Sequence, residues 1–449
     1  MKPVALFSGC YLCAKDYEEA GLKFISPMLA KEIEDEEKQN ACLSSPNYYV
    51  EEKFDGTRAT LHFCSEFVRV FSRRVSEKTG WLCENSDSVP HIRDILIREL
   101  EGTILDGEMF IPNRPFKDVA STLNCKWDKA VERQEEIGKI VFHAFDILYY
   151  KGIRVENMPL HRRKEYLQKV IDTVNSPYIE MVKYYPCNTL IPVRITEVAK
   201  LRRKESSYPT LVKEMNALDT GNNPFINPVG VTPRAYYEYI VATGGEGVIV
   251  KPIDGKYMQD KRGWEYSKIK KFLTREAIIM GFTDPTDDYK GKFPTIDKWD
   301  YWETVEQDVF DLSSCTPAER EQFKKNWYPS ECRPVSKFYA KGWVGNIRFG
   351  VIITPEEVDK LPKSKKFNIE KWSIEDKDVL ILEVGECSGF DEETREYMSD
   401  NKSEFIGHVV EVKANELFKD TGKLRHPRFL RMRTDKSPLE CTLKGHLND

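Results

Sequence analysis

A lysine that stands before an Asp-Gly pair is the first residue whose surroundings suggest chemistry. Lys53 ends a strand-like run, and Asp-Gly separates this run from a second one within the segment YYVEEKFDGTRATLHF at residues 48–63. Asp-Gly between two such runs predicts a hairpin with a two-residue turn. Side chains alternate faces along a strand, so the predicted hairpin has one polar and one apolar face and places Lys53 directly opposite Arg58.

This facing pair of cations indicates chemistry rather than stability. Like charges across a strand pair repel, so a fold with no use for Lys53 and Arg58 should avoid the arrangement. A neighbouring cation and partial burial lower the pKa of a lysine, and a nucleophilic lysine needs some neutral amine near neutral pH. Glu51 beside it is expected to orient the amine. Taken alone, a Lys-x-Asp-Gly segment is more often a solvated lysine before a turn. The interpretation of Lys53 as a nucleophile therefore needs support from further motifs.

Further short motifs follow along the chain, and each is a weak signal alone. Together they resemble the motifs of the covalent nucleotidyltransferases, the superfamily of ATP-dependent DNA ligases, RNA ligases and mRNA capping enzymes. The matching segments, in the order of that superfamily, are KFDGTR at 53–58, FSRR at 71–74 with EKTG at 77–80, LDGE at 105–108, AFDIL at 144–148, EGVIVK at 246–251, KIK at 268–270 and LRHPRFLRMRTDK at 424–436.

Three segments favour a DNA ligase within this superfamily. Residues 71–80 and 424–436, with PMLA at 27–30, resemble DNA ligases more than RNA ligases or capping guanylyltransferases, which would use GTP and an RNA diphosphate end. An inactive nucleic-acid-binding module on the same fold is the non-enzyme alternative, and intact residues at every motif argue against it. The resemblance implies a compact ligase of the phage and viral type, acting as a monomer on nicked double-stranded DNA.

The resemblance also implies a role for each residue near the nucleophile. Lys53 attacks ATP to form a covalent adenylate, which passes to the 5′-phosphate of a nick before the 3′-hydroxyl displaces AMP. Glu51 accepts a hydrogen bond from the adenine amino group, and Phe145 stacks on the ring. Glu108 contacts the ribose or a metal, and Glu246 binds a divalent cation. We expect Mg²⁺, because phosphoryl chemistry with ATP generally needs it to offset charge.

Cationic side chains complete the implied site. Lys268 and Lys270 are two apart in a strand-like segment, so both project from one face together with Tyr266 and can hold the α-phosphate. Arg73 resembles the arginine that holds the 5′-phosphate of the nick, a task suited to a guanidinium fork. The expected cofactor-binding residues are Glu51, Arg58, Arg73, Glu108, Phe145, Glu246, Lys251, Lys268, Lys270 and Arg433.

The C-terminal motif is implied to act on pyrophosphate. Arg431, Arg433, Asp435 and Lys436 would orient it as it leaves ATP and then move out to admit DNA, although the sequence itself shows only a basic strand. The DNA need not be read by sequence, because phosphate contacts position without specifying. The expected DNA contacts are Arg73, Arg425, Arg428, Arg431 and Lys436.

Strand and turn signals dominate up to residue 150, helical signals dominate 159–204, and strands fill the C-terminal third. The expected fold class is α+β, an antiparallel-sheet-rich, ATP-grasp-like nucleotidyltransferase domain followed by an OB-fold β-barrel, which suits strand-like runs at 348–353, 379–384, 408–413 and 428–433. We expect an N-terminal extension at 1–23, an adenylation domain at 24–271 with an exposed loop at 216–233, and an OB-fold domain at 272–449 with an acidic insertion at about 282–334.

Composition bounds these expectations. The chain has 449 residues, of which 40% are hydrophobic, enough for two or three cores. The net charge of −5 does not indicate a nucleic-acid partner, but residues 251–271 carry seven basic against three acidic side chains and 422–444 carry seven against two. Such stretches contact phosphates or are solvated faces, whereas 284–311 is acidic.

The termini and the cysteines give little further direction. The sequence has no stretch of 18 apolar residues and no secretory signal, so we expect no membrane association and a cytoplasmic location in a bacterial or phage-infected cell, or a nuclear one in a eukaryotic or viral setting. The 11 cysteines lack the spacing of a disulfide scaffold. Cys10 and Cys13 form one CxxC without a second pair, so we interpret them as ordinary thiols.

Overall fold

The computed structural model of the chain describes residues 25–75, 82–194, 207–218, 229–287, 300–327 and 332–447. Contacts within the chain divide it into two units, Met1–Lys271 (unit 1) and Phe272–Asp449 (unit 2). Cys10, Cys13 and the predicted motif at 77–80 lie outside the described residues.

A five-stranded sheet in unit 1 carries Lys53. Its order is β1-β14-β13-β2-β10, with β1 (Leu29–Glu32), β2 (Tyr48–Lys53), β10 (Tyr184–Pro186), β13 (Gly247–Pro252) and β14 (Arg262–Lys270). β2 runs antiparallel to both of its neighbours, β13 and β10. Fully buried valines at 50, 248 and 250 suit these strands, because β-branched side chains pack well on a pleated surface.

A seven-stranded sheet is the second layer of unit 1. Its order is β5-β4-β3-β6-β7-β8, with β9 beside β7, and its strands are β3 (Thr57–Phe63), β4 (Val68–Val75), β5 (Leu82–Glu84), β6 (Ile104–Phe110), β7 (Val141–Tyr150), β8 (Ile153–Arg154) and β9 (Ile179–Met181). A separate two-stranded sheet pairs β11 (Ile191–Val193) with β12 (Val229–Val231).

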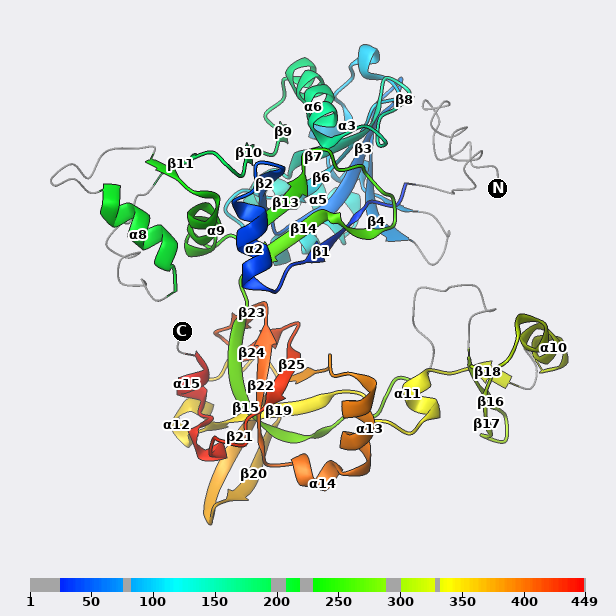
Figure 1. The fold of residues 1–449 in the computed structure, drawn as a ribbon, viewed down its shortest axis with the longest axis vertical. Helices are drawn as coiled ribbons and strands as arrows, with labels where there is room; N and C mark the ends of the chain where they lie inside the picture. Colours follow the sequence, from blue (N-terminus) through cyan, green and yellow to red (C-terminus); the bar gives the residue numbers. More distant parts are fainter. Residues whose placement is uncertain are drawn as a thin grey trace. The chain divides into compact units, whose positions relative to one another are not determined.

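Helices cover the outer faces of the two sheets (Figure 1). They are α2 (Glu36–Leu43), α3 (Pro90–Arg93), α4 (Phe116–Leu123), α5 (Trp127–Ile137), α6 (Leu160–Val174), α8 (Pro209–Leu218) and α9 (Pro233–Ala242). Leu167 of α6 joins the core of the seven-stranded sheet, and Leu211 of α8 joins that of the five-stranded sheet. A third core, which includes Leu148 and Ile249, joins the inner faces of the two sheets.

Unit 2 is built on a six-stranded antiparallel sheet of order β20-β21-β19-β15-β22-β25. The strands are β15 (Leu273–Phe282), β19 (Ile347–Ile353), β20 (Ile369–Ile374), β21 (Lys377–Cys387), β22 (Val409–Ala414) and β25 (Arg428–Met432). The four strand-like runs predicted here are thereby confirmed as strands. A bridge between Ser388 and Arg428 brings the chain after β21 to the edge strand β25.

Smaller elements surround this sheet. They are the hairpin of β23 (Glu416–Phe418) with β24 (Lys423–Arg425), and the helices α11 (Lys337–Ala340), α12 (Pro355–Val358), α13 (Glu392–Asp400), α14 (Lys402–Phe405) and α15 (Leu443–Leu447). In the segment expected to be an insertion, β16 (Tyr301–Thr304), β17 (Val309–Asp311) and β18 (Cys332–Pro334) form their own sheet, and Trp302 packs in a small core with Phe323 of α10 (Pro317–Trp327).

Strands dominate the region before residue 150, as expected, although it also contains α2, α4 and α5. The helical span expected at 159–204 was wrong after Val174, where α6 ends and short strands follow. The loop expected at 216–233 is helical up to Leu218 and forms β12 at Val229–Val231, with 219–228 outside the described residues. Short strands and helices depend on the surfaces that they pack against, which a local pattern does not contain.

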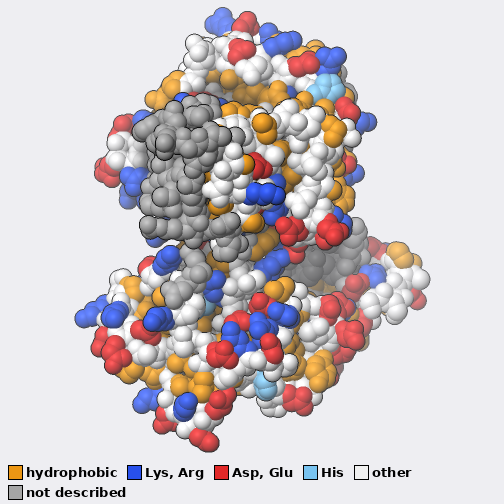
Figure 2. Space-filling model, turned by 60° about the vertical axis from the view of Figure 1, so that its left-hand side comes forward, with side chains coloured by type: hydrophobic (Ala, Val, Ile, Leu, Met, Phe, Trp, Pro, Cys, Tyr) orange, Lys and Arg blue, Asp and Glu red, His pale blue; other side chains and the backbone are white. Residues whose placement is uncertain are grey.

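Surface charge is mixed in sign. Figure 2 shows Lys and Arg side chains beside Asp and Glu side chains over the face of the molecule that it presents. No helix in the described ranges is long and apolar enough to span a membrane.

Candidate active site

A cavity of about 380 Å³ in unit 1 is lined by residues from both sheets. Seven of the residues singled out from the sequence line it, although they come from distant parts of the chain. These are Glu51, Lys53, Arg58, Arg73, Glu108, Phe145 and Lys268. The remaining lining residues include Glu52, Phe54, Arg262 and Tyr266.

Lys53 is the last residue of β2, and its ammonium group meets the carboxylate of Glu246. The Nζ and Oε2 atoms lie 2.5 Å apart. Lys53 pairs in register with Gly247, the first residue of β13, so Glu246 stands beside the end of β2. Gly247 has a φ of 142°, and a Cβ there would lie 2.2 Å from the carbonyl oxygen of Ile269. Only glycine fits this close approach, which therefore helps to place Glu246.

The hairpin predicted around Asp55 and Gly56 was wrong. β2 belongs to the five-stranded sheet and β3 to the seven-stranded sheet, so the Asp-Gly segment connects two layers instead of closing a hairpin. Lys53 and Arg58 therefore do not face each other across a strand pair. Glu51 does not orient the amine of Lys53 either, since that contact belongs to Glu246.

The cation near Lys53 is Lys270. Its side chain is largely buried, and burial lowers its pKa; Glu32 and Glu246 oppose this shift, while the ammonium groups of Lys268 and Lys53 add to it. Lys268 lines the cavity and forms an ion pair with Glu32 of the adjacent strand at 3.3 Å. The two lysines of β14 thus lie near the nucleophile candidate, and Glu32 is a partner that the motifs did not indicate.

The guanidinium group of Arg58 is held by the carboxylate of Asp106, which is distant in sequence. Its Nε and Nη2 donate to the two oxygens of Asp106 at 2.7 and 2.6 Å, and the hydroxyl of Tyr257 donates to the same carboxylate at 2.6 Å. The guanidinium carbon lies 4.6 Å from the ring centre of Phe145. Arg58 therefore fixes the wall of the cavity that Phe145 and Tyr266 form, with ring centres 5.9 Å apart.

Glu51 lies at the back of the cavity between two buried lysines. Lys251 of β13 lies 2.7 Å from one of its oxygens, and Lys164 of α6 forms an ion pair with the other. Both lysines also donate to the carbonyl oxygen of Phe145, at 3.3 and 2.9 Å. Burial lowers the pKa of Lys251 to about 8 in spite of the ion pair.

Lys164 is a site residue that the motifs did not reveal. The buried residues of α6 include Leu160, Arg163, Lys164 and Leu167, a spacing of one helical face. A lysine and an arginine at positions that the helix must bury are the sequence signal for buried ion pairs here. Arg163 accordingly binds Asp146 through two hydrogen bonds of 2.7 and 3.0 Å.

The carboxylates of Glu108 and Glu246 are the residues that fit a divalent cation. Burial raises the pKa of Glu108 to about 7, against the opposing effect of Lys53 and Arg58, and Asp106 and Glu246 raise it further. Mg²⁺ is commonly bound by one or two carboxylates together with substrate phosphates, and the assignment of these two carboxylates to a cation remains a prediction. Within the described ranges no group of three or more His, Cys, Asp or Glu side chains is arranged to hold a metal by itself.

Two exposed arginines stand at the cavity. Arg73 of β4 lines it, as does Arg262, whose Nη1 donates to the carbonyl oxygen of Ala30 at 2.8 Å. Arg262 was not among the residues selected from the sequence.

The C-terminal basic residues belong to unit 2, and Arg425, Arg431, Arg433 and Lys436 meet acidic partners there. Arg425 lies 3.4 Å from Glu416, and Arg431 lies 2.6 Å from Glu411. Arg433 and Lys436 share Glu276, and Arg433 also donates to Asp435 at 2.8 and 2.9 Å. Their expected contact with the residues of the cavity remains a prediction.

Comparison with known proteins finds similarity to ATP-dependent DNA ligases over part of this chain. Residues 27–195 match the family described as "ATP dependent DNA ligase domain". A DNA ligase of Methanococcus vannielii is 24% identical over 264 residues, which cover 57% of this chain and 39% of that protein. A DNA ligase of Methanocaldococcus jannaschii is 27% identical over 267 residues, covering 59% of this chain and 41% of that protein.

The chain thus spans about two fifths of the length of these two relatives. A solved structure named Pmar-Lig_Pre has a TM-score of 0.50 and 16% identity, covers 94% of this chain and 70% of that one, and so shares its fold. The matched family region contains Lys53 and most of the residues that line the cavity. Over this region the chain is similar to ATP-dependent DNA ligases.

Proposed function

We propose that this protein is an ATP-dependent DNA ligase that seals nicks in duplex DNA through a covalent adenylate on Lys53. One observation carries the proposal. The ammonium group of Lys53 lies 2.5 Å from the carboxylate of Glu246 beside a cavity of about 380 Å³, in a chain similar to ATP-dependent DNA ligases.

Three phosphoryl transfers make up the reaction. The neutral amine of Lys53 attacks the α-phosphorus of ATP, an N–P bond forms, and the P–O bond to pyrophosphate breaks. The 5′-phosphate of the nick then attacks the same phosphorus and frees Lys53. Finally the 3′-hydroxyl attacks the 5′-phosphate, and AMP leaves as the backbone closes.

The side chains in the cavity divide the work of the first step. Glu51, held between its two buried lysine partners, accepts a hydrogen bond from the adenine amino group, and Phe145 packs against the base. Lys268 and Lys270 stabilise the charge on the α-phosphate. Mg²⁺, held by Glu108 and Glu246, would offset the charge of the triphosphate.

Arg73 acts in the second step. It is exposed and lines the cavity, so a phosphate outside the nucleotide can reach it. The partner is nicked duplex DNA, bound by a single copy of the chain. A guanidinium fork matches a phosphate in geometry and charge.

Unit 2 is proposed to be an OB fold that presents Arg433 and Lys436 to the leaving pyrophosphate. Six antiparallel strands with irregular register in several pairs, and the bridge from Ser388 to β25, support a curved sheet that approaches closure.

The test is incubation with ATP labelled at the α-phosphate, followed by denaturing electrophoresis. Wild-type protein and Lys117→Ala, which changes an exposed lysine of α4, should become labelled, whereas Lys53→Ala should stay unlabelled while keeping its melting temperature. Label from GTP instead of ATP would indicate a capping guanylyltransferase. No label from either nucleotide would leave a non-catalytic binding module. Sealing of nicked duplex DNA, compared with nicked RNA, completes the assignment.

A further inference from the structure

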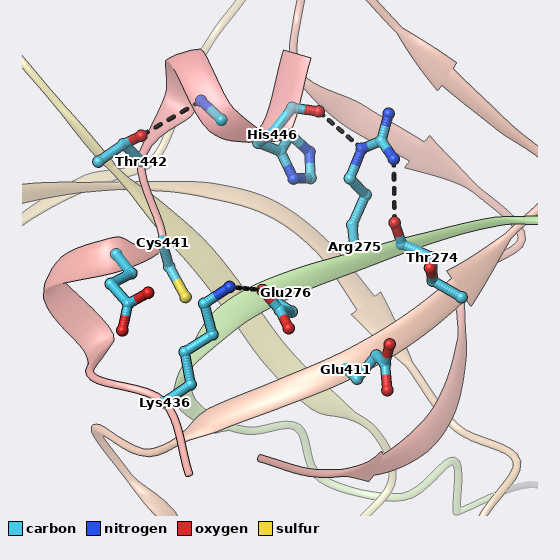
Figure 3. A pocket seen from close by; sticks show the side chains of 10 residues that line it. Thr274, Arg275, Glu276, Glu411, Lys436, Cys441, Thr442 and His446 are labelled. Carbon is cyan, nitrogen blue, oxygen red and sulfur yellow. Dashed lines mark hydrogen bonds and ion pairs between the residues drawn. The ribbon is translucent and has the colours of Figure 1, made fainter. Parts of the chain in front are cut away.

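Glu276 of β15 is bound by both cations that follow β25. Its Oε1 accepts from Nη1 of Arg433, and its Oε2 accepts from Nζ of Lys436. Figure 3 shows Lys436 and Glu276 pointing toward each other in a pocket of unit 2, with Glu411 on the neighbouring strand. The side chains of Arg433, Lys436 and Glu276 are 19, 25 and 22% exposed, so this cluster is only partly open to water.

The same strand pair carries a second carboxylate directly opposite Glu276. Glu276 and Glu411 are register partners on β15 and β22, and like charges at such positions repel. Arg431 lies 2.6 Å from Glu411, so three cations of the C-terminal strand neutralise two facing carboxylates. Withdrawing Arg433 and Lys436 leaves the carboxylate of Glu276 without its two partners and opposite Glu411.

The guanidinium of Arg433 is occupied at all three of its nitrogens. Nη1 donates to Glu276, while Nε and Nη2 donate to Asp435. Three of its five N–H donors are thus engaged by carboxylates. A phosphate would compete with these carboxylates for the guanidinium of Arg433.

We propose that Glu276 is a positioning residue that competes with the triphosphate of ATP for Arg433 and Lys436, and so sets the ATP concentration at which Lys53 becomes adenylated. This inference rests on the proposed function. Asp435 lies two residues from Arg433 in sequence, whereas Glu276 belongs to another strand, so the contacts with Glu276 are the ones that tie both cations to β15. When pyrophosphate oxygens replace Glu276 as the partner of these two cations, the ion pairs with Glu276 are lost. This loss reduces the free energy gained on binding ATP.

Glu276→Gln isolates this effect, because glutamine keeps the shape and one acceptor but removes the charge. The ATP concentration that gives half the maximal rate of adenylation should fall by about two- to tenfold, the range that partly exposed ion pairs allow. The maximal rate should stay within about twofold. By the same argument, the pyrophosphate concentration needed to reverse adenylation should fall in parallel. Glu276→Asp, which restores the charge, should return both values toward wild type.

Glu383→Gln is the matched control. It makes the same chemical change at a carboxylate of similar exposure (20%) on β21, but its partner is Arg348 at 2.6 Å, which has no assigned role with pyrophosphate, so the ATP requirement should stay near wild type. Single-turnover labelling with ATP labelled at the α-phosphate measures each variant, and melting curves show that each is folded. An unchanged or increased ATP requirement in folded Glu276→Gln would overturn the inference. Absence of any adenylate in the wild type would overturn the proposed function instead.

Discussion

Replacing Lys164 with methionine should destabilise unit 1 by about 3 kcal/mol and strongly weaken its use of ATP. Lys164 and Glu51 are both 1% exposed, and their ion pair is one of two that hold this carboxylate. Methionine fills nearly the same volume as the lysine stem, so the change removes the charge and its hydrogen bonds with little added cavity.

The size of the expected loss of stability depends on the contacts that Glu51 and the carbonyl oxygen of Phe145 keep in the Lys164→Met variant. Removing one partner of a buried ion pair costs about 3–5 kcal/mol, because an uncompensated charge stays buried. Glu51 keeps Lys251 at 2.7 Å, and the carbonyl oxygen of Phe145 keeps the weaker bond from Lys251 at 3.3 Å. The expected loss therefore lies at the lower end of that range. Lys251 cannot hold both carboxylate oxygens equally, so Glu51 should turn and lose its acceptor geometry for adenine.

Urea denaturation measures the free energy of unfolding, and labelling with ATP measures adenylation. Lys169→Met is the control, since Lys169 is exposed on the same helix and should change stability by less than about 0.5 kcal/mol. A double variant with Glu51→Gln should be less destabilised than the sum of the two single changes, because both charges of the pair are then gone. A loss below about 1 kcal/mol for Lys164→Met, or strictly additive effects, would refute the assignment of a coupled buried pair.

Three further predictions address the remaining groups. Phe145→Ala should weaken use of ATP much more than sealing of a nick that already carries 5′-adenylate; equal losses in the two assays would indicate a packing role. Arg73→Ala should adenylate normally yet slow AMP transfer to DNA by about ten- to hundredfold, or about 1.5–3 kcal/mol, while Arg433→Ala should fail with ATP and still close the pre-adenylated nick; the reverse pattern would reject both roles. Burial lowers the pKa of His446 to about 4 and that of His62 to about 3, from 6.5, so the unfolded state takes up protons first as pH falls. Urea curves at pH 7 and 4.5 should therefore show a free energy of unfolding that decreases on acidification, by on the order of 3 kcal/mol for His446 alone at most, and a flat profile would contradict the buried neutral state.

Local patterns located many strands correctly. The runs that became β19, β21, β22 and β25 alternate or are rich in β-branched residues, and each lies where the sequence placed it. This works because the side-chain period of two is a property of the strand itself. The same period explains why Tyr266 and Lys268 of β14 both line the cavity.

Pairing between strands was not readable from the same patterns. Asp55-Gly56 has the composition of a hairpin turn, yet the chain passes there from one sheet to the other, and β2 pairs with β13 instead of β3. A turn signal describes four residues, whereas the partner of a strand is decided by surfaces almost two hundred residues away. The contact of Lys53 with Glu246 depends on that distant pairing.

The sequence by itself determined the types of residue available for chemistry, their order in the motifs and four of the six strands in the main sheet of unit 2. Only the tertiary structure decided the partners: Glu246 for Lys53, Asp106 for Arg58, and two lysines for Glu51. The physical reason is that a buried charge is tolerable only beside its counter-charge, and the counter-charges here come from strands and a helix remote in sequence. Lys164 carries only the local signal of a charged residue on the buried face of α6, and Glu276 acquires its importance from its placement in the sheet of unit 2.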